Sequence, residues 1–115
     1  MTMPAPSNAA RGAAAYRRGM TPKQMEAEVF ARAARATRMA EAGTAPDRVR
    51  AGADNRRLWN AVHGAVTDPS NGLPPALRAR IAGVALAAVR ECDAAEPDFG
   101  FVADLNEQVA AGLWG

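Results

Sequence analysis

Helix-start signals recur along this chain, and the division they impose constrains the fold more than any other feature. Residues 21–24, TPKQ, combine a threonine N-cap, a proline at the first helical position and a capping-box glutamine. Residues 44–47, TAPD, repeat the signal just after Gly43, a natural C-cap. The prolines of LPP, 73–75, and the cap residue Asp98 begin two more segments. We therefore predict an all-α fold, a small bundle of about four helices without strands.

Apolar residues recur every three or four positions in these segments, as on a helix that buries one face. The connection at Gly43 is so short that the first two helices should be antiparallel neighbours. The segment 73–92 is apolar around most of its circumference, so we expect it to be the central helix, with Leu73 stapled onto Leu77. The predicted buried stripes are Met25, Val29, Ala33, Ala36 and Ala40 with Phe30 and Thr37; Val49, Gly52, Asn55, Leu58, Trp59, Val62 and Val66; and Val102, Leu105, Val109 and Leu113.

The size and composition are those of one soluble globular domain. We expect a flexible N-terminal tail over residues 1–20 and a helical domain over 21–115. The longest uncharged apolar run, 81–89, has nine residues, well short of the roughly 20 that cross a bilayer. Cys92 is the only cysteine, so no internal disulfide or cysteine metal cluster can form, which fits a reducing cytoplasm.

The charges are unevenly distributed along the chain. Residues 1–90 hold all 14 basic and six acidic groups, whereas residues 91–115 hold six acidic groups and no basic ones. An acidic last helix could therefore neutralise a basic neighbour inside the fold. Because Arg56 and Arg57 are about 100° apart on a helix, they cannot share one face. At least one of them should therefore point toward solvent, a partner or the acidic last helix, and the simplest use is to tether that helix through Asp104 or Glu107.

The residues offer no catalytic set. His63 is the only histidine and lies far in sequence from Cys92, and no nucleophile motif, metal set or phosphate loop is present. We therefore expect a non-enzyme without a cofactor or a small-molecule substrate. The arginine-rich faces of residues 32–38 and 48–57 could bind phosphate, but they lack the exposed aromatic side chains that single-stranded RNA usually stacks on. A solvated face is the favoured interpretation, and RNA is an unlikely partner.

Three large side chains leave alternatives open. Asn55 and Asn106 lie on predicted apolar stripes, where an amide is costly to bury unpaired. Each amide either bonds a neighbouring helix terminus or loop carbonyl, which is favoured, or contacts a ligand. Trp59 is either a core residue whose indole needs one acceptor, as is most often the case, or a partner contact.

Three motifs, NRRLW at 55–59, NGLPPALRARI at 71–81 and LNEQVAAGL at 105–113, resemble the flagellar biosynthesis regulator family FlaF. The resemblance covers about residues 21–113. The chain departs from the family pattern on either side of Asn106, at Leu105 and Glu107, where the family tends toward isoleucine and arginine. The matching positions are Asn55, Arg56, Arg57, Leu58 and Trp59; Asn71, Leu73, Pro74, Leu77, Arg78 and Ala79; and Asn106, Gly112 and Leu113.

The resemblance implies a small cytoplasmic protein that acts as a flagellin-specific chaperone or a positive regulator of flagellin synthesis and export. It also implies a repressor partner, FlbT, that acts on flagellin messenger RNA. A bundle of this size could receive an amphipathic flagellin segment in a groove between helices. The alternatives are an RNA-associated translational regulator of flagellin mRNA and an adaptor that bridges an FlbT-like repressor and flagellin.

Overall fold

The structure, a computed structural model, describes residues 22–114, with side chains from Gln24 to Gly112. This part of the chain holds four helices and no strand: α2 (Pro22–Glu41), α3 (Ala45–Thr67), α4 (Pro75–Cys92) and α5 (Phe99–Trp114). The predicted all-α fold is confirmed. The predicted tail over residues 1–20 and the predicted cap at Thr21 lie outside the described residues.

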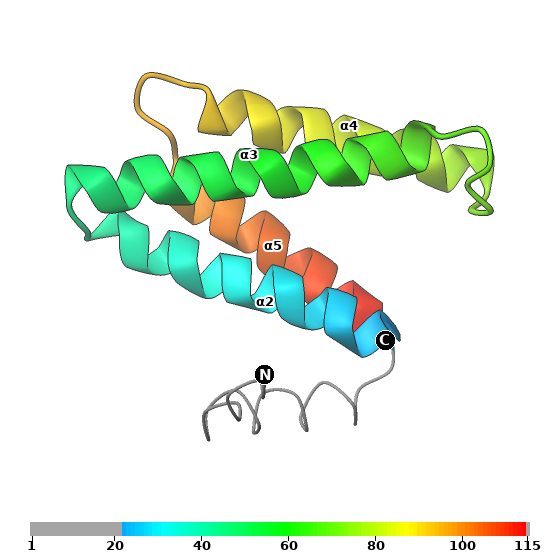
Figure 1. Cartoon of the computed structure of the whole chain (residues 1–115), viewed down its shortest axis with the longest axis horizontal. Helices are drawn as coiled ribbons and strands as arrows, with labels where there is room; N and C mark the ends of the chain where they lie inside the picture. The colour runs from blue at the N-terminus through cyan, green and yellow to red at the C-terminus, as the bar shows by residue number, and fades with distance from the viewer. Residues whose placement is uncertain (1–21, 115) are drawn as a thin grey trace, which may run out of the picture.

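The helices form two pairs, with α2 packed along α5 and α3 packed along α4 (Figure 1). The first two helices contact each other near their shared corner, where Ala40 and Ala51 share a cluster, and again midway, where Phe30 meets Trp59, but each has its main packing partner elsewhere. The prediction that 73–92 would be the central helix is wrong. On α4, Val84 and Leu86 are exposed, and α3 instead contacts both α2 and α4. A side of α4 is left uncovered because α5 pairs with α2.

The core is built from two aromatic rings and many alanines. Phe30 of α2 and Trp59 of α3 meet edge to face, with ring centroids 5.4 Å apart. Around them pack Ala85, Ala88 and Ala110, whose small side chains let the helices approach closely. A second cluster joins Ala40, Ala51 and Phe99 at the other end of the bundle.

The predicted stripe of α2 is displaced, whereas that of α3 is wrong at Val49 alone: Gly52, Asn55, Trp59 and Val66 are buried as predicted, and Leu58 and Val62 pack against the core. Val49 is 73% exposed and Val29 is 50% exposed. On α2 the buried line follows the face that α5 covers, and the hydroxyl of Thr37 is buried on it with bonds to the Ala33 and Ala34 carbonyls. The buried residues of α2 are Ala27, Phe30, Ala34, Thr37 and Ala40.

The α2–α3 corner is closed by a capping box and an arginine. Thr44 and Asp47 form the predicted reciprocal pair of bonds. Gly43 does not adopt a positive φ, so it is not a left-handed C-cap. A Cβ at this position would lie 3.0 Å from the Asp47 carboxylate. Glycine therefore fits here because the Asp47 side chain comes too close for a larger residue. The last α2 carbonyls, those of Ala40 and Glu41, instead accept bonds from the Arg48 guanidinium, at 3.2 and 2.8 Å.

The α3–α4 corner uses the same device. Arg78, like Arg48, is the fourth residue of its helix, and it donates to the carbonyls of Val66 and Asp68, both at 2.8 Å. Asn71 adds a bond to the Ala65 carbonyl at 2.9 Å. Leu73 and Leu77, which were predicted to form a staple, are 41% and 39% exposed, so neither belongs to the buried core. Within the described residues, no helix is long and apolar enough to span a bilayer.

Candidate partner-binding groove

A buried chain of hydrogen bonds joins α3 to α5. The indole N–H of Trp59 donates to Oδ1 of Asn106 at 3.0 Å, and Nδ2 of Asn106 donates to Oδ1 of Asn55 at 2.8 Å. Asn55 in turn donates to the Ala51 carbonyl at 2.8 Å. All three side chains are at most 2% exposed. Trp59 is therefore a core residue, and the two amides are satisfied inside the fold, by each other rather than by a helix terminus or a loop.

The predicted tether from Arg56 or Arg57 to the last helix is wrong. Arg56 bonds Asp93 in the loop after α4, at 2.9 Å, and Arg57 lies 3.8 Å from Asp54 on its own helix. The reason is the face that each residue occupies. Asn55 and Trp59 lie on the side of α3 that reaches α5, whereas Arg56 points toward the end of α4.

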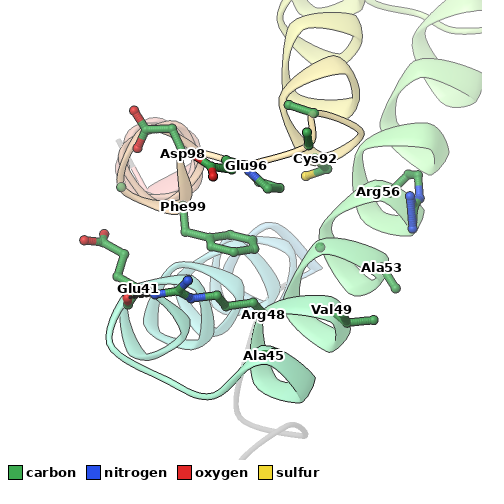
Figure 2. A pocket seen from close by; sticks show the side chains of 15 residues that line it. Glu41, Ala45, Arg48, Val49, Ala53, Arg56, Cys92, Glu96, Asp98 and Phe99 are labelled. Atoms are coloured by element: carbon green, nitrogen blue, oxygen red, sulfur yellow. Dashed lines mark hydrogen bonds between the residues drawn. The ribbon is translucent and has the colours of Figure 1, made fainter.

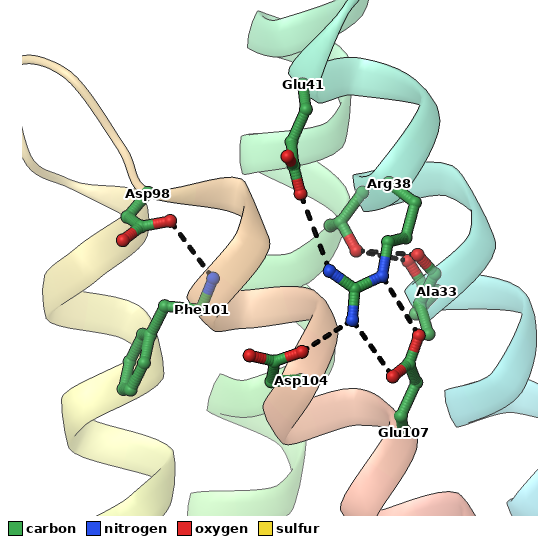
Figure 3. A network of polar contacts seen from close by, with 9 residues as sticks. Ala33, Arg38, Glu41, Asp98, Phe101, Asp104 and Glu107 are labelled. Carbon is green, nitrogen blue, oxygen red and sulfur yellow. Dashed lines mark hydrogen bonds and ion pairs between the residues drawn. The ribbon is translucent and has the colours of Figure 1, made fainter.

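Arg38 of α2 holds the acidic last helix instead (Figure 3). Its guanidinium donates to both carboxylate oxygens of Glu107 at 3.0 Å and also bonds Asp104. Glu41 lies 3.6 Å away on the same helix. These bonds, first to Glu107 and then to Asp104, raise the pKa of Arg38 above its usual value. Sequence reasoning missed Arg38, although the opposite charges of the two segments predicted that such a pair would exist.

A cavity of about 800 Å³ lies at one end of the bundle, beside the N-terminal half of α3 (Figure 2). Gly52, Cys92 and Phe99, all buried, line it. Burial raises the pKa of the Cys92 thiol, so the thiol is a poor nucleophile at neutral pH. The described residues contain no group of metal-ligating side chains that could hold an ion.

Most charged residues around this end cavity have a part in the fold. Arg48 caps α2, and Arg56 bonds the loop after α4. Asp98 caps α5 as predicted, accepting from the Phe101 N–H at 3.0 Å. Glu41 lies beside Arg38. The cavity therefore does not present a preformed charged site for a small molecule.

A second hollow, of about 440 Å³, is an apolar groove between α4 and α5. Val84 is 38% exposed and Phe101 is 40% exposed, and a Cβ added at Gly83 would meet nothing within 4 Å. Figure 3 shows the Phe101 ring directed from α5 toward α4, away from Arg38. The α4–α5 groove is lined by Ala79, Arg80, Gly83, Val84, Ala87, Phe101 and Leu105.

The residues predicted as site positions lie elsewhere. Of the positions that match the family pattern, only Ala79 lines the α4–α5 groove, together with Arg80 and Leu105 from within the quoted motifs. Arg78 and Asn71 hold the α3–α4 corner, and Leu58 packs against the core. Leu73, Pro74 and Leu77 are exposed at that corner, and the Leu113 side chain lies outside the described residues. A direct role of these residues in partner binding stays a prediction.

A helical chain that uses its polar side chains to hold the fold and leaves apolar side chains open in a groove has the features of a protein-binding module. A family model described as "Flagellar protein FlaF" matches residues 10–113, so the chain belongs to the FlaF family of flagellar proteins. The matched range begins earlier than the resemblance carried by the sequence motifs, which starts at about residue 21. Neither a curated protein nor a solved structure matches the chain.

Proposed function

We propose that this FlaF protein is a flagellin-specific chaperone or positive regulator of flagellin synthesis and export, and that the α4–α5 groove receives an amphipathic helix of flagellin. The observation that carries the proposal is the open apolar groove in a member of a flagellar family. Exposed Phe101 and Val84 face a space that no described residue fills.

The groove suits a helix as its guest. Ala79, Gly83 and Ala87 are spaced by four residues, so they lie along one side of α4 and leave room for a second backbone to come close. Phe101 and Leu105 form the opposite wall on α5. A guest that lays its apolar face between these walls removes apolar surface from water, which is the main favourable term in such association.

RNA binding is supported less well. The arginines that suggested a phosphate-binding face are largely engaged within the fold: Arg35 bonds Glu28 at 3.0 Å, and Arg38, Arg48 and Arg56 have the partners described above. Bridging to an FlbT-like protein needs a second surface, and the end cavity offers one. The adaptor role is therefore the second candidate.

Co-elution with flagellin from the same organism tests the proposal. We expect a soluble one-to-one complex by size-exclusion chromatography with light scattering, and Gly83→Gln should abolish it by filling the groove. Gly64→Gln is a matched control, because Gly64 is also exposed, helical and without neighbours within 4 Å of an added Cβ, but it does not line the groove. If the wild-type protein forms no complex at about 10 μM, roughly ten times a micromolar Kd, the proposal is contradicted.

A further inference from the structure

Arg80 is the one charged residue among those that line the α4–α5 groove, and it is exposed. It makes no hydrogen bond or ion pair to another residue of the described chain. No acidic residue occurs on α4 between 76 and 84, within one helical turn of it. Its neighbour Arg78 donates to backbone carbonyls and brings no negative charge. Arg80 therefore adds positive charge to an otherwise apolar surface.

The position of Arg80 along the groove is set by the direction of the helices. The loop 93–98 connects the end of α4 to the start of α5, so Ala87 and Phe101 are the lining residues nearest the loop. Arg80 lies about two helical turns before Ala87 and so farther from the loop. In Figure 1 the two helices diverge as they leave this loop. Arg80 thus lies toward the open end of the groove.

We propose that Arg80 is a specificity-determining residue of the groove, which contacts a carboxylate at the border of the guest helix's apolar face. This inference rests on the proposed use of the α4–α5 groove by a helix. It adds that the guest is acidic at the end that lies farthest from the loop 93–98. The apolar walls accept any amphipathic helix of suitable width, whereas one cation at one end distinguishes guests by charge and fixes their register.

The chemistry of arginine fits this role. Its planar guanidinium presents paired N–H donors that match the two oxygens of a carboxylate. The apolar face of the guest helix would reduce the contact of the arginine–carboxylate pair with water, and this strengthens the attraction between the two charges. A lysine or arginine at the same position of the guest would meet like charge, so the selection is both attractive and repulsive.

Two synthetic amphipathic peptides test the inference without relying on flagellin. Both have a leucine–alanine apolar face of about five turns, and they differ in one residue at the border of that face, glutamate in one and lysine in the other. We expect the wild-type protein to bind the glutamate peptide about tenfold more tightly, as rim charges that discriminate partners do. The preference should disappear in Arg80→Ala and reverse in Arg80→Glu.

The matched control is Arg90→Glu, because Arg90 is an exposed arginine of α4 that also has no partner in the described chain but lies outside the groove. It should keep the wild-type preference. The preference should also shrink as salt rises from about 0.1 M to about 1 M, where the screening length falls from about 10 Å to about 3 Å. Equal binding of the two peptides by the wild type, binding of neither, or a preference that survives Arg80→Ala overturns the inference. A preference that follows Arg80 while flagellin fails to co-elute supports the inference and overturns the proposed partner.

Discussion

Trp59 on α3 and Asn106 on α5 are 47 positions apart, and a buried hydrogen bond of 3.0 Å joins them. Asn106 uses its other amide atom to reach Asn55, so one side chain satisfies two buried groups of α3. Because α3 and α5 belong to different helix pairs, these bonds fix the position of one pair against the other. Alanine-rich surfaces could slide over each other, and a directional bond prevents this.

Replacing Asn106 with alanine should be among the most destabilising changes in the chain. It leaves the Trp59 N–H and the Asn55 oxygen buried without partners, at about 1–3 kcal/mol each, and we expect a total loss of about 3–5 kcal/mol. Trp59→Phe, which keeps a ring but removes the N–H, should cost about 1–2 kcal/mol. Urea unfolding followed by circular dichroism measures both. Gln108→Ala, at an exposed position of the same helix, should stay within about 0.5 kcal/mol; a similar value for Asn106→Ala would show that the bonds carry no stability.

Arg38→Ala should release the acidic last helix from α2. The melting temperature should fall further than in Arg35→Ala, because among the described residues Arg35 pairs with Glu28 of its own helix, whereas Arg38 bonds two carboxylates of α5. The difference between the variants should shrink at high salt, since all of these groups are exposed. Arg38→Lys should recover only part of the loss, because an ammonium lacks the paired donors that Glu107 accepts. Equal melting temperatures for the two alanine variants would contradict the tether.

Arg78→Lys should loosen the α3–α4 corner. The guanidinium reaches two carbonyls with separate nitrogens, Val66 through Nε and Asp68 through Nη2, and the single ammonium nitrogen of a lysine cannot occupy both positions. We expect a loss of about 1–2 kcal/mol in the free energy of unfolding. Arg80→Lys, at an exposed position two residues further on, supplies the comparison and should change stability by less than about 0.5 kcal/mol. If both lysine variants unfold alike, the corner does not depend on Arg78.

The sequence predicted the helix boundaries well because caps and turns are local. The threonine, proline and aspartate of 44–47 act within one turn, so their chemistry does not depend on the rest of the fold. The face that each helix buries was predicted less well. Val49 fits the apolar period of α3 but is exposed, because which neighbour covers a helix depends on how distant segments pair.

The candidate site shows the same division. The sequence singles out Asn55, Asn106 and Trp59, because a polar group in an apolar stripe needs a partner. It could not show that these three side chains would bond one another in a single buried chain of hydrogen bonds. The last helix was expected to need a cation, and the sequence could not show that Arg38 rather than Arg56 supplies it. A groove between helices was expected, but its position was not: the apolar circumference of 73–92 predicts burial, whereas the pairing of α5 with α2 leaves that side of α4 open.

Stability should fall at acid pH because the pKa values of two carboxyl groups, Asp47 and Asp68, are lowered in the folded protein. Bonds from Thr44, first its backbone and then its side chain, lower the pKa of Asp47, and bonds from Ser70 lower the pKa of Asp68. A carboxyl whose pKa is lower in the folded state stabilises the fold fully above its unfolded pKa of about 3.9, and this contribution is lost as pH falls through the folded pKa. The double variant Asp47→Asn, Asp68→Asn should therefore be less stable near neutral pH and lose less stability below about pH 4. Parallel acid-unfolding curves for the two proteins would show that these bonds do not contribute.

The rate at which the Cys92 thiol is labelled should measure how often the end cavity opens. The thiol is 7% exposed, and burial raises its pKa, so the reactive thiolate is both scarce and covered in the folded protein. We expect labelling by a disulfide reagent at about pH 8 to be at least about a hundredfold slower than for an exposed cysteine, because reaction requires local opening of the fold.

Ser70→Cys in a Cys92→Ala background provides that exposed reference in the same chain, since Ser70 lies in the exposed α3–α4 turn. Asn106→Ala should accelerate the labelling of Cys92, because it weakens the contact between the helix pairs, and should leave the labelling of the reference thiol unchanged. Equal rates at the two positions in otherwise unaltered protein would mean that the cavity opens freely and that Cys92 is accessible in the native fold.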